Sequence, residues 1–185
     1  NAQRELDGFY AVMAAIAYGH DELALRLIDM EGIDLRKKAK LGMTAMMRAV
    51  KQNKFHIFEK LFKATDKLAD QDKDGWTIVH HATYHGHENL LKELVELDAP
   101  LDMKDRSGQT ALHIAVHEEH AHCLKILLDG GADTTIEDAE EMTAIQLCTG
   151  AENETEMMAI FRLFAQERNT ASGPLAGLLS GLQAV

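Results

Sequence analysis

The stretch TIVHHATYHGHENL, residues Thr77–Leu90, contains four histidines within eight residues, namely His80, His81, His85 and His87. Imidazoles this close together are typical of zinc sites or of acid–base catalysis. The stretch is repeated, however, because related segments begin 33 residues apart at Thr44, Thr110 and Thr143. Self-similarity at a fixed period of about 33 residues is the signature of a stacked repeat architecture. The histidines therefore have to be interpreted by their position in the repeat.

Other positions keep the same period. Glycines precede three of the threonines, at Gly42, Gly75 and Gly108, with Glu141 in the fourth copy, and a weaker copy with a 34-residue step passes through Ala15 and Leu27. Each threonine hydroxyl stands where it can cap the free backbone N–H groups of a helix. A polar turn and a second helix with apolar residues at i, i+3 and i+4 follow. One pair of short helices cannot bury its apolar face alone, so the pattern predicts pairs stacked around one continuous core.

The segments DKDGWTIVHHATYHGH and DRSGQTALHIAVHEEH resemble the ankyrin repeat family, whose pattern runs D-x-x-G-x-T-P-L-H-x-A-A-x-x-G-H before an apolar helix and G-A-D. The segment LLDGGAD, Leu127–Asp133, supplies that closing turn. The resemblance implies an all-α ankyrin-repeat solenoid over residues 1–168, built from helix–turn–helix units joined by hairpin-like loops. Its five repeats are expected at about 6–37, 38–71, 72–104, 105–137 and 138–168. The first and fifth are degenerate, as terminal capping units are, and the family's proline is replaced at Ala45, Ile78, Ala111 and Ala144.

The resemblance divides the histidines by position. His80 and His113 fall in the T-x-x-H position, where the ring is expected to bond the threonine hydroxyl and the adjacent loop, and His87 and His120 fall at the turn between helices. His81 stands where the family usually has leucine, in the packing layer. His81 and His85 have an i, i+4 spacing that suits a metal pair, but no further ligand with fixed spacing accompanies them, so no metal site and no cofactor are expected.

The positions that face the concave groove of an ankyrin-like stack form the expected partner-binding set. They comprise loop tips and the helix residues before the turn: Phe9, Tyr18, Lys40, Met43, Lys51, Gln52, Lys73, Trp76, Tyr84, His85, Arg106, Gln109, His117 and Glu118. The one Trp and two of the three Tyr of the chain fall on this set. Because Trp and Tyr are the usual anchors of interfaces, they favour recognition of a protein. A tryptophan lying flat on the neighbouring repeat is the structural alternative.

Composition restricts the class of partner. The net charge of −11 argues against a nucleic-acid binder, since phosphate contacts need a basic face. Residues 36–67 carry ten Lys or Arg and two acids, whereas residues 129–167 carry ten acids and one base. These charges are either ordinary solvated surface or a binding surface. In the second case they would bind a partner segment whose charges run in the opposite sense, or an acidic or phosphorylated stretch that docks near Arg36–Lys40. No apolar run approaches the roughly 20 residues needed to cross a bilayer, so no membrane insertion is expected.

The two cysteines, Cys123 and Cys148, are both expected as buried free thiols. Free thiols indicate a reducing compartment, hence a cytoplasmic location with the nucleus as the alternative. The chain begins with Asn rather than Met, and we expect it to be an excerpt of a longer protein.

The last seventeen residues, 169–185, form a separate unit by composition because they carry no charge. Leu175, Leu178, Leu179, Leu182 and Val185 make one helical stripe, which Gly177 and Gly181 weaken by roughly 1 kcal/mol each. Such a segment needs a surface to become helical. It is expected as a cap on the fifth repeat, with disorder or binding in a groove, including that of another copy, as the alternatives.

The expected function is a non-catalytic protein–protein interaction module whose concave groove holds a peptide or domain of a partner. The sequence shows no phosphate loop, no nucleophile with a fitting base and no carboxylate pair outside the repeats, so catalysis within these residues is not expected. The alternative is that these repeats regulate or target a larger enzyme or channel whose active part lies outside the chain.

Overall fold

The computed structural model describes residues 8–148 and 156–169. Over these residues the protein is all-α, and the one isolated β-bridge joins Glu137 to Thr143. The α-helices are α1 Gly8–Ala17, α2 Asp21–Ile28, α3 Ala45–Lys51, α4 Phe55–Thr65, α5 Ile78–Tyr84, α6 Glu88–Glu96, α7 Ala111–His117, α8 Ala121–Asp129, α9 Ala144–Leu147 and α10 Glu156–Asn169. A short 3-10 helix, η1 Lys40–Gly42, precedes α3.

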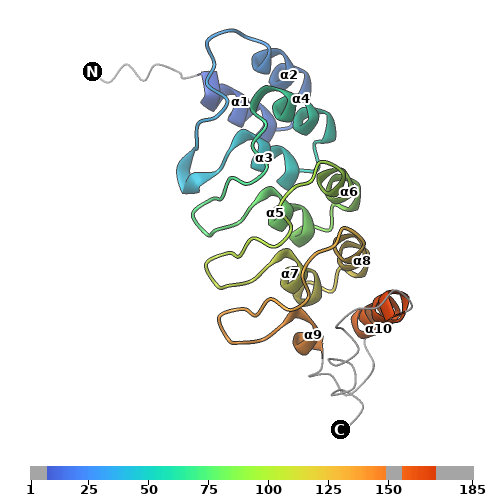
Figure 1. The fold of residues 1–185 in the computed structure, drawn as a ribbon. Coiled ribbons are helices and arrows are strands. Elements are labelled where there is room, and N and C mark those ends of the chain that lie inside the picture. Colours follow the sequence, from blue (N-terminus) through green and yellow to red (C-terminus); the bar gives the residue numbers. More distant parts are fainter. Residues whose placement is uncertain (1–7, 149–155, 170–185) are drawn as a thin grey trace.

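The helices stack in two columns. Figure 1 shows α1, α3, α5, α7 and α9 in an inner column, α2, α4, α6, α8 and α10 in an outer column, and the connecting hairpins projecting from the inner side. Within the inner column α5 packs against both α3 and α7, and in the outer column α8 packs against α6 and α10. The predicted stack of helix pairs is therefore confirmed.

Local chemistry explains where the inner helices begin. Thr77 has an extended backbone, and its hydroxyl oxygen accepts the N–H of His80 three residues later. Thr44 and Thr143 cap α3 and α9 in the same way. Each cap satisfies a backbone donor that has no partner inside the helix, so the predicted caps are confirmed for these three threonines.

The core lies between the two columns and runs without interruption along the stack. Small residues recur on the inner helices at Ala49, Ala82 and Ala115, all 0% exposed, and let neighbouring helices approach closely. Large apolar residues on the outer helices fill the space between them, with Phe58, Leu91 and Leu124 also fully buried. The shared 33-residue period thus brings equivalent residues into one layer of the core.

The hairpins are linked into a row by backbone hydrogen bonds. Lys73 N donates to the carbonyl of Leu41 at 2.8 Å, and Arg106 N donates to that of Asp74 at 3.0 Å. The close approach explains one glycine, because Gly108 has φ +77° and a Cβ there would lie 2.7 Å from the backbone N of Ala139. The row places one hairpin of each repeat beside the next.

Two sequence-based expectations have different outcomes at the ends of the chain. The prediction that Phe9 lies at an exposed loop tip is wrong, because α1 already begins at Gly8 and Phe9 is 1% exposed. The physical reason is that Tyr10 stands where the other repeats have a capping threonine. No cap starts the helix at this position, so Phe9 lies within α1 and its side chain packs in the core. The C-terminal cap was expected within 169–185, and 170–185 lie outside the described residues.

Cys123 and Cys148 are free and buried, as predicted. Burial raises the pKa of each thiol to about 11, which leaves both protonated at neutral pH.

Candidate functional site

His80 and His113 support the hairpins. The Nδ1 atom of His80 accepts the backbone N–H of Thr77 at 3.1 Å, and its Nε2 atom donates to the carbonyl of Gln109, in the next hairpin, at 3.3 Å. His113 repeats this arrangement with Thr110 at 3.2 Å and Met142 at 3.0 Å. Burial lowers the pKa of both rings, so both are neutral at pH 7. The predicted structural role of this pair is confirmed.

His87 and His120 also join neighbouring repeats. The Nε2 atom of His87 lies 3.2 Å from the carbonyl of Lys51 at the end of α3, and the Nε2 atom of His120 lies 3.1 Å from that of Tyr84 at the end of α5. Each ring thereby satisfies a C-terminal helix carbonyl that lacks an intrahelical partner. Four of the histidines that drew attention in the sequence are thus part of the scaffold.

A strip of rings crosses the third repeat from its hairpin to its inner turn. Trp76, on the hairpin, packs against Tyr84 at the end of α5, with ring centroids 5.0 Å apart. Tyr84 in turn meets His85 edge-on at 5.0 Å. Tyr84 is 39% exposed, and Trp76 and His85 are half-buried. The structure therefore brings together three of the residues predicted to bind a partner.

Charged residues from the two adjacent repeats flank this strip. Desolvation is the largest cause that lowers the pKa of His85, followed by the neighbouring His87 and by the positive charge of Lys51 at the end of α3, whereas the carboxylate of Glu118 raises it. His117, which is exposed, holds Glu118 through an Nδ1 to Oε1 contact of 3.1 Å. The strip thus has a cation on the side of repeat two and a carboxylate on the side of repeat four.

Beneath the strip lies a buried polar contact that the sequence did not reveal. The Nε2 atom of His81 lies 2.9 Å from Oδ2 of Asp72, and both side chains are only 5% exposed. Desolvation lowers the pKa of His81 in spite of this carboxylate, so at neutral pH the contact is a hydrogen bond from a neutral ring. The Trp76 ring lies 5.2 Å from that of His81. The only available signal was a histidine in a position where the family has leucine.

Trp76 also makes a contact with the next repeat. Its indole Nε1 donates to Oδ2 of Asp105 at 3.1 Å, and its backbone N–H donates to Oδ1 of Asp72 at 2.9 Å. The hydrogen bond to Asp105 gives this tryptophan a structural contact with the neighbouring repeat. The ring also meets His81 edge-on at 5.2 Å and Tyr84 at a tilt at 5.0 Å, so Trp76 both joins the hairpins and belongs to the strip.

The remaining predicted residues are distributed along the same side of the stack. Met43 and Gln109 are half-buried next to their capping threonines, and Lys51 is exposed at the end of α3. Gln52 donates through Nε2 to the carbonyl of Ala17 at 3.2 Å, which ties α3 to the first repeat. Tyr18 is 79% exposed at the far end of the stack. The structure thus concentrates the aromatic residues of the set in repeat three and leaves Tyr18 apart from them.

Residues 64–138 match the family model described as ankyrin repeats, in three copies. This segment therefore carries ankyrin repeats. No curated protein matches the sequence at a significant level. Ankyrin repeats are in general protein–protein interaction modules and are typically non-catalytic. The match covers both helix pairs α5/α6 and α7/α8, and with them the strip that contains Trp76 and Tyr84.

Across the described parts of the chain, no three His, Cys, Asp or Glu side chains are grouped as metal ligands. In the same residues, none of the helices has the length and hydropathy required to span a bilayer. The chemical feature that stands out in the described residues is the strip of rings between Lys51 and Glu118.

Proposed function

We propose that this chain is a recognition module that binds a segment of a partner protein along the concave side of its ankyrin repeats. The observation that carries the proposal is the strip formed by Trp76, Tyr84 and His85. Aromatic rings supply large contact area at a low cost in conformational entropy, and they are enriched at the energetic centres of interfaces. Lys51 on one side and Glu118 on the other provide a polar rim.

The strip favours an elongated partner segment that crosses neighbouring repeats. Its aromatic centre belongs to repeat three, whereas its charges come from repeats two and four. An apolar side chain of the partner on Tyr84 would bury surface that is now 39% exposed. The rim charges would set orientation and encounter rate more than affinity. The alternative assignment, that these repeats target a larger enzyme or channel, uses the same surface.

The proposal extends to the compartment in which the chain works. Two buried free thiols, Cys123 and Cys148, support a reducing environment such as the cytoplasm or nucleus.

Selection from a random peptide library tests the site. Peptides selected on the wild-type chain should lose affinity by about thirtyfold or more for Tyr84→Ala, which corresponds to about 2 kcal/mol for an interface anchor. Lys51→Glu should act more weakly, and its effect should shrink with added salt. Fluorescence anisotropy of the selected peptides measures both effects.

Matched variants keep the test specific. His122→Ala removes an exposed ring from α8, on the outer column, and should leave binding unchanged. Trp76→Ala should also weaken binding, but it removes the hydrogen bond to Asp105, so its unfolding free energy must be measured alongside. Selected peptides that bind Tyr84→Ala as tightly as wild type would place the partner elsewhere.

A further inference from the structure

Three cations occupy the same position on three consecutive hairpins. Lys40, Lys73 and Arg106 each follow the residue that opens its hairpin, and all three are exposed. None of their side chains forms a hydrogen bond or ion pair with another described residue. Lys38, by contrast, lies 3.1 Å from a carboxylate oxygen of Asp70. The hairpin row therefore presents three cations that have no partner among the described residues.

The spacing of this row follows from the stack. The hydrogen bonds from Lys73 N to Leu41 and from Arg106 N to Asp74 hold the hairpins side by side. Packed helices in successive repeats lie roughly 8–10 Å apart, so the cations recur at about that distance. A polyproline-type extended chain advances about 3.1 Å per residue and turns once in three residues. Its side chains at i, i+3 and i+6 would therefore meet three successive hairpins.

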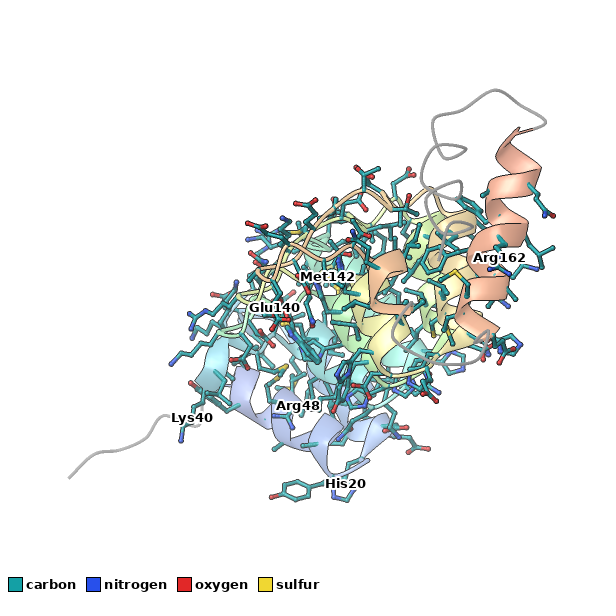
Figure 2. All side chains as sticks on the ribbon, turned by 90° about the horizontal axis from the view of Figure 1, so that it is seen from below. His20, Lys40, Arg48, Glu140, Met142 and Arg162 are labelled. Carbon is teal, nitrogen blue, oxygen red and sulfur yellow. The ribbon has the colours of Figure 1, made fainter. Side chains whose placement is uncertain are left out.

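Acidic residues limit both the length and the pattern of a ligand for this row. Asp74 is exposed between Lys73 and Arg106 and would repel an acid placed between them. In the next hairpin Ala139 takes the cation's position, and the exposed Glu140 and Glu141 follow it. Figure 2 labels Lys40 and Glu140 on the hairpin side of the stack, opposite Arg162 of α10. The row thus favours separated acids and ends at the fourth hairpin.

We propose that the row formed by Lys40, Lys73 and Arg106 binds an extended acidic protein segment with a carboxylate at every third residue. The inference rests on the proposed function, since it names the chemistry of the partner on the hairpin side of the same surface. A nucleic acid fits less well, because it carries a phosphate at every nucleotide and the chain has a net charge of −11.

Two synthetic peptides test the spacing. The first carries three Glu residues at positions 2, 5 and 8 of a blocked, fluorescein-labelled Gly/Ser/Pro peptide of about 10 residues, and the second carries the same three Glu consecutively. At low ionic strength the spaced peptide should bind the wild-type chain at least about fivefold more tightly, since several exposed pairs of modest strength add. Lys73→Glu should remove this preference.

A charge exchange and a control variant complete the experiment. A peptide with Lys in place of the central Glu should bind Lys73→Glu more tightly than it binds wild type. Lys92→Glu changes an exposed cation on α6, in the outer column, and should not alter the preference. Equal binding of the two Glu peptides, or an equal loss in Lys92→Glu, would overturn the proposal, as would tighter binding of a single-stranded oligonucleotide of equal length.

The outcome is separable from that of the proposed function. Tyr84 lies outside the row, so Tyr84→Ala should leave binding of the spaced peptide unchanged. Library peptides that depend on Tyr84, together with no preference for the spaced peptide, would refute the acidic segment alone. A preference for the spaced peptide without any Tyr84-dependent ligand would refute the aromatic site alone.

Discussion

At the scale of single residues, one structural task is performed by side chains of three types. The backbone N–H of each capping threonine donates to the side chain three residues later, which is Met47, His80, His113 or Gln146. The acceptors are a thioether sulfur, an imidazole nitrogen and an amide oxygen. The histidines add a second bond, from Nε2 to the next hairpin, which explains why they recur in the central repeats.

Replacing His113 by alanine should lower the unfolding free energy by about 1–3 kcal/mol, because the N–H of Thr110 and the carbonyl of Met142 lose their buried partner. Chemical denaturation followed by circular dichroism measures the change. His117→Ala provides the control, since that side chain is 71% exposed and its loss should cost little. An equal effect in the two variants would contradict the structural role of His113.

Acidification should destabilise the fold through the same histidines. Burial lowers the folded-state pKa of His80, His81 and His113 below the ordinary value of 6.5. Because the unfolded chain then binds protons that the folded chain excludes, these histidines do not reduce the free energy of unfolding above about pH 6.5. The free energy of unfolding falls as the pH is lowered below that value. Denaturation curves at pH 7.5 and pH 5.5 test this sign.

His113→Gln is the matched variant for the pH experiment. Gln146 shows that an amide oxygen can accept the threonine N–H in this position, at 2.7 Å, and an amide does not titrate. The variant should therefore lose less stability than wild type between the two pH values. A pH dependence as steep as that of wild type would exclude His113 as a contributor.

At the scale of elements, the loops depend on two glycines with different surroundings, Gly108 on a hairpin and Gly131 in the turn after α8. Gly108 and Gly131 both have positive φ, +77° and +87°, but a Cβ on Gly108 would lie 2.7 Å from Ala139 N, whereas one on Gly131 would meet nothing within 4 Å. The first therefore combines backbone strain with a clash against the next hairpin, and the second has strain alone.

Gly131→Ala should cost about 1–2 kcal/mol, the usual strain of a left-handed alanine. Gly108→Ala should cost distinctly more, because the backbone of the next hairpin has to move. Thermal unfolding of the two variants compares the costs directly. Equal losses of thermal stability in the two variants would mean that the neighbouring hairpin moves away from the added Cβ at no cost in free energy.

At the scale of the whole molecule, residues at equivalent positions of different repeats contribute different amounts to the free energy of unfolding. Leu90 on α6 is 0% exposed, whereas Leu23, at the equivalent position of α2, is 50% exposed. Stacking against another outer helix accounts for the difference, because α2 is the first outer helix of the described structure (Figure 1).

Leu90→Ala should therefore lower the unfolding free energy by about 2–5 kcal/mol, the usual cost of a cavity in a packed core. Leu23→Ala should cost less than about 1 kcal/mol, because much of that side chain already contacts solvent. Equilibrium urea denaturation gives both values. A large loss for Leu23→Ala would indicate that this face is covered in solution.

Much of the architecture was determined by sequence alone. The 33-residue period and the threonine caps follow from local chemistry that repeats in each copy, so a single alignment of the chain with itself reveals them. The bonding of His80 and His113 was implied by the resemblance to ankyrin repeats. The first repeat shows where this reasoning fails. Without a threonine at position 10 there is no local signal that begins the helix, and burial of Phe9 was decided by packing.

Only the tertiary structure decided which candidate residues belong together. The hydrogen bond from Trp76 to Asp105 joins residues of different repeats, and the buried contact of His81 with Asp72 lies beneath the aromatic strip. The alignment of Lys40, Lys73 and Arg106, which have no partner within residues 8–148 and 156–169, also depends on how the hairpins lie. Period and spacing specify equivalent positions, but contacts between repeats depend on rotamers, burial and the distance between neighbouring hairpins, which a linear pattern does not contain.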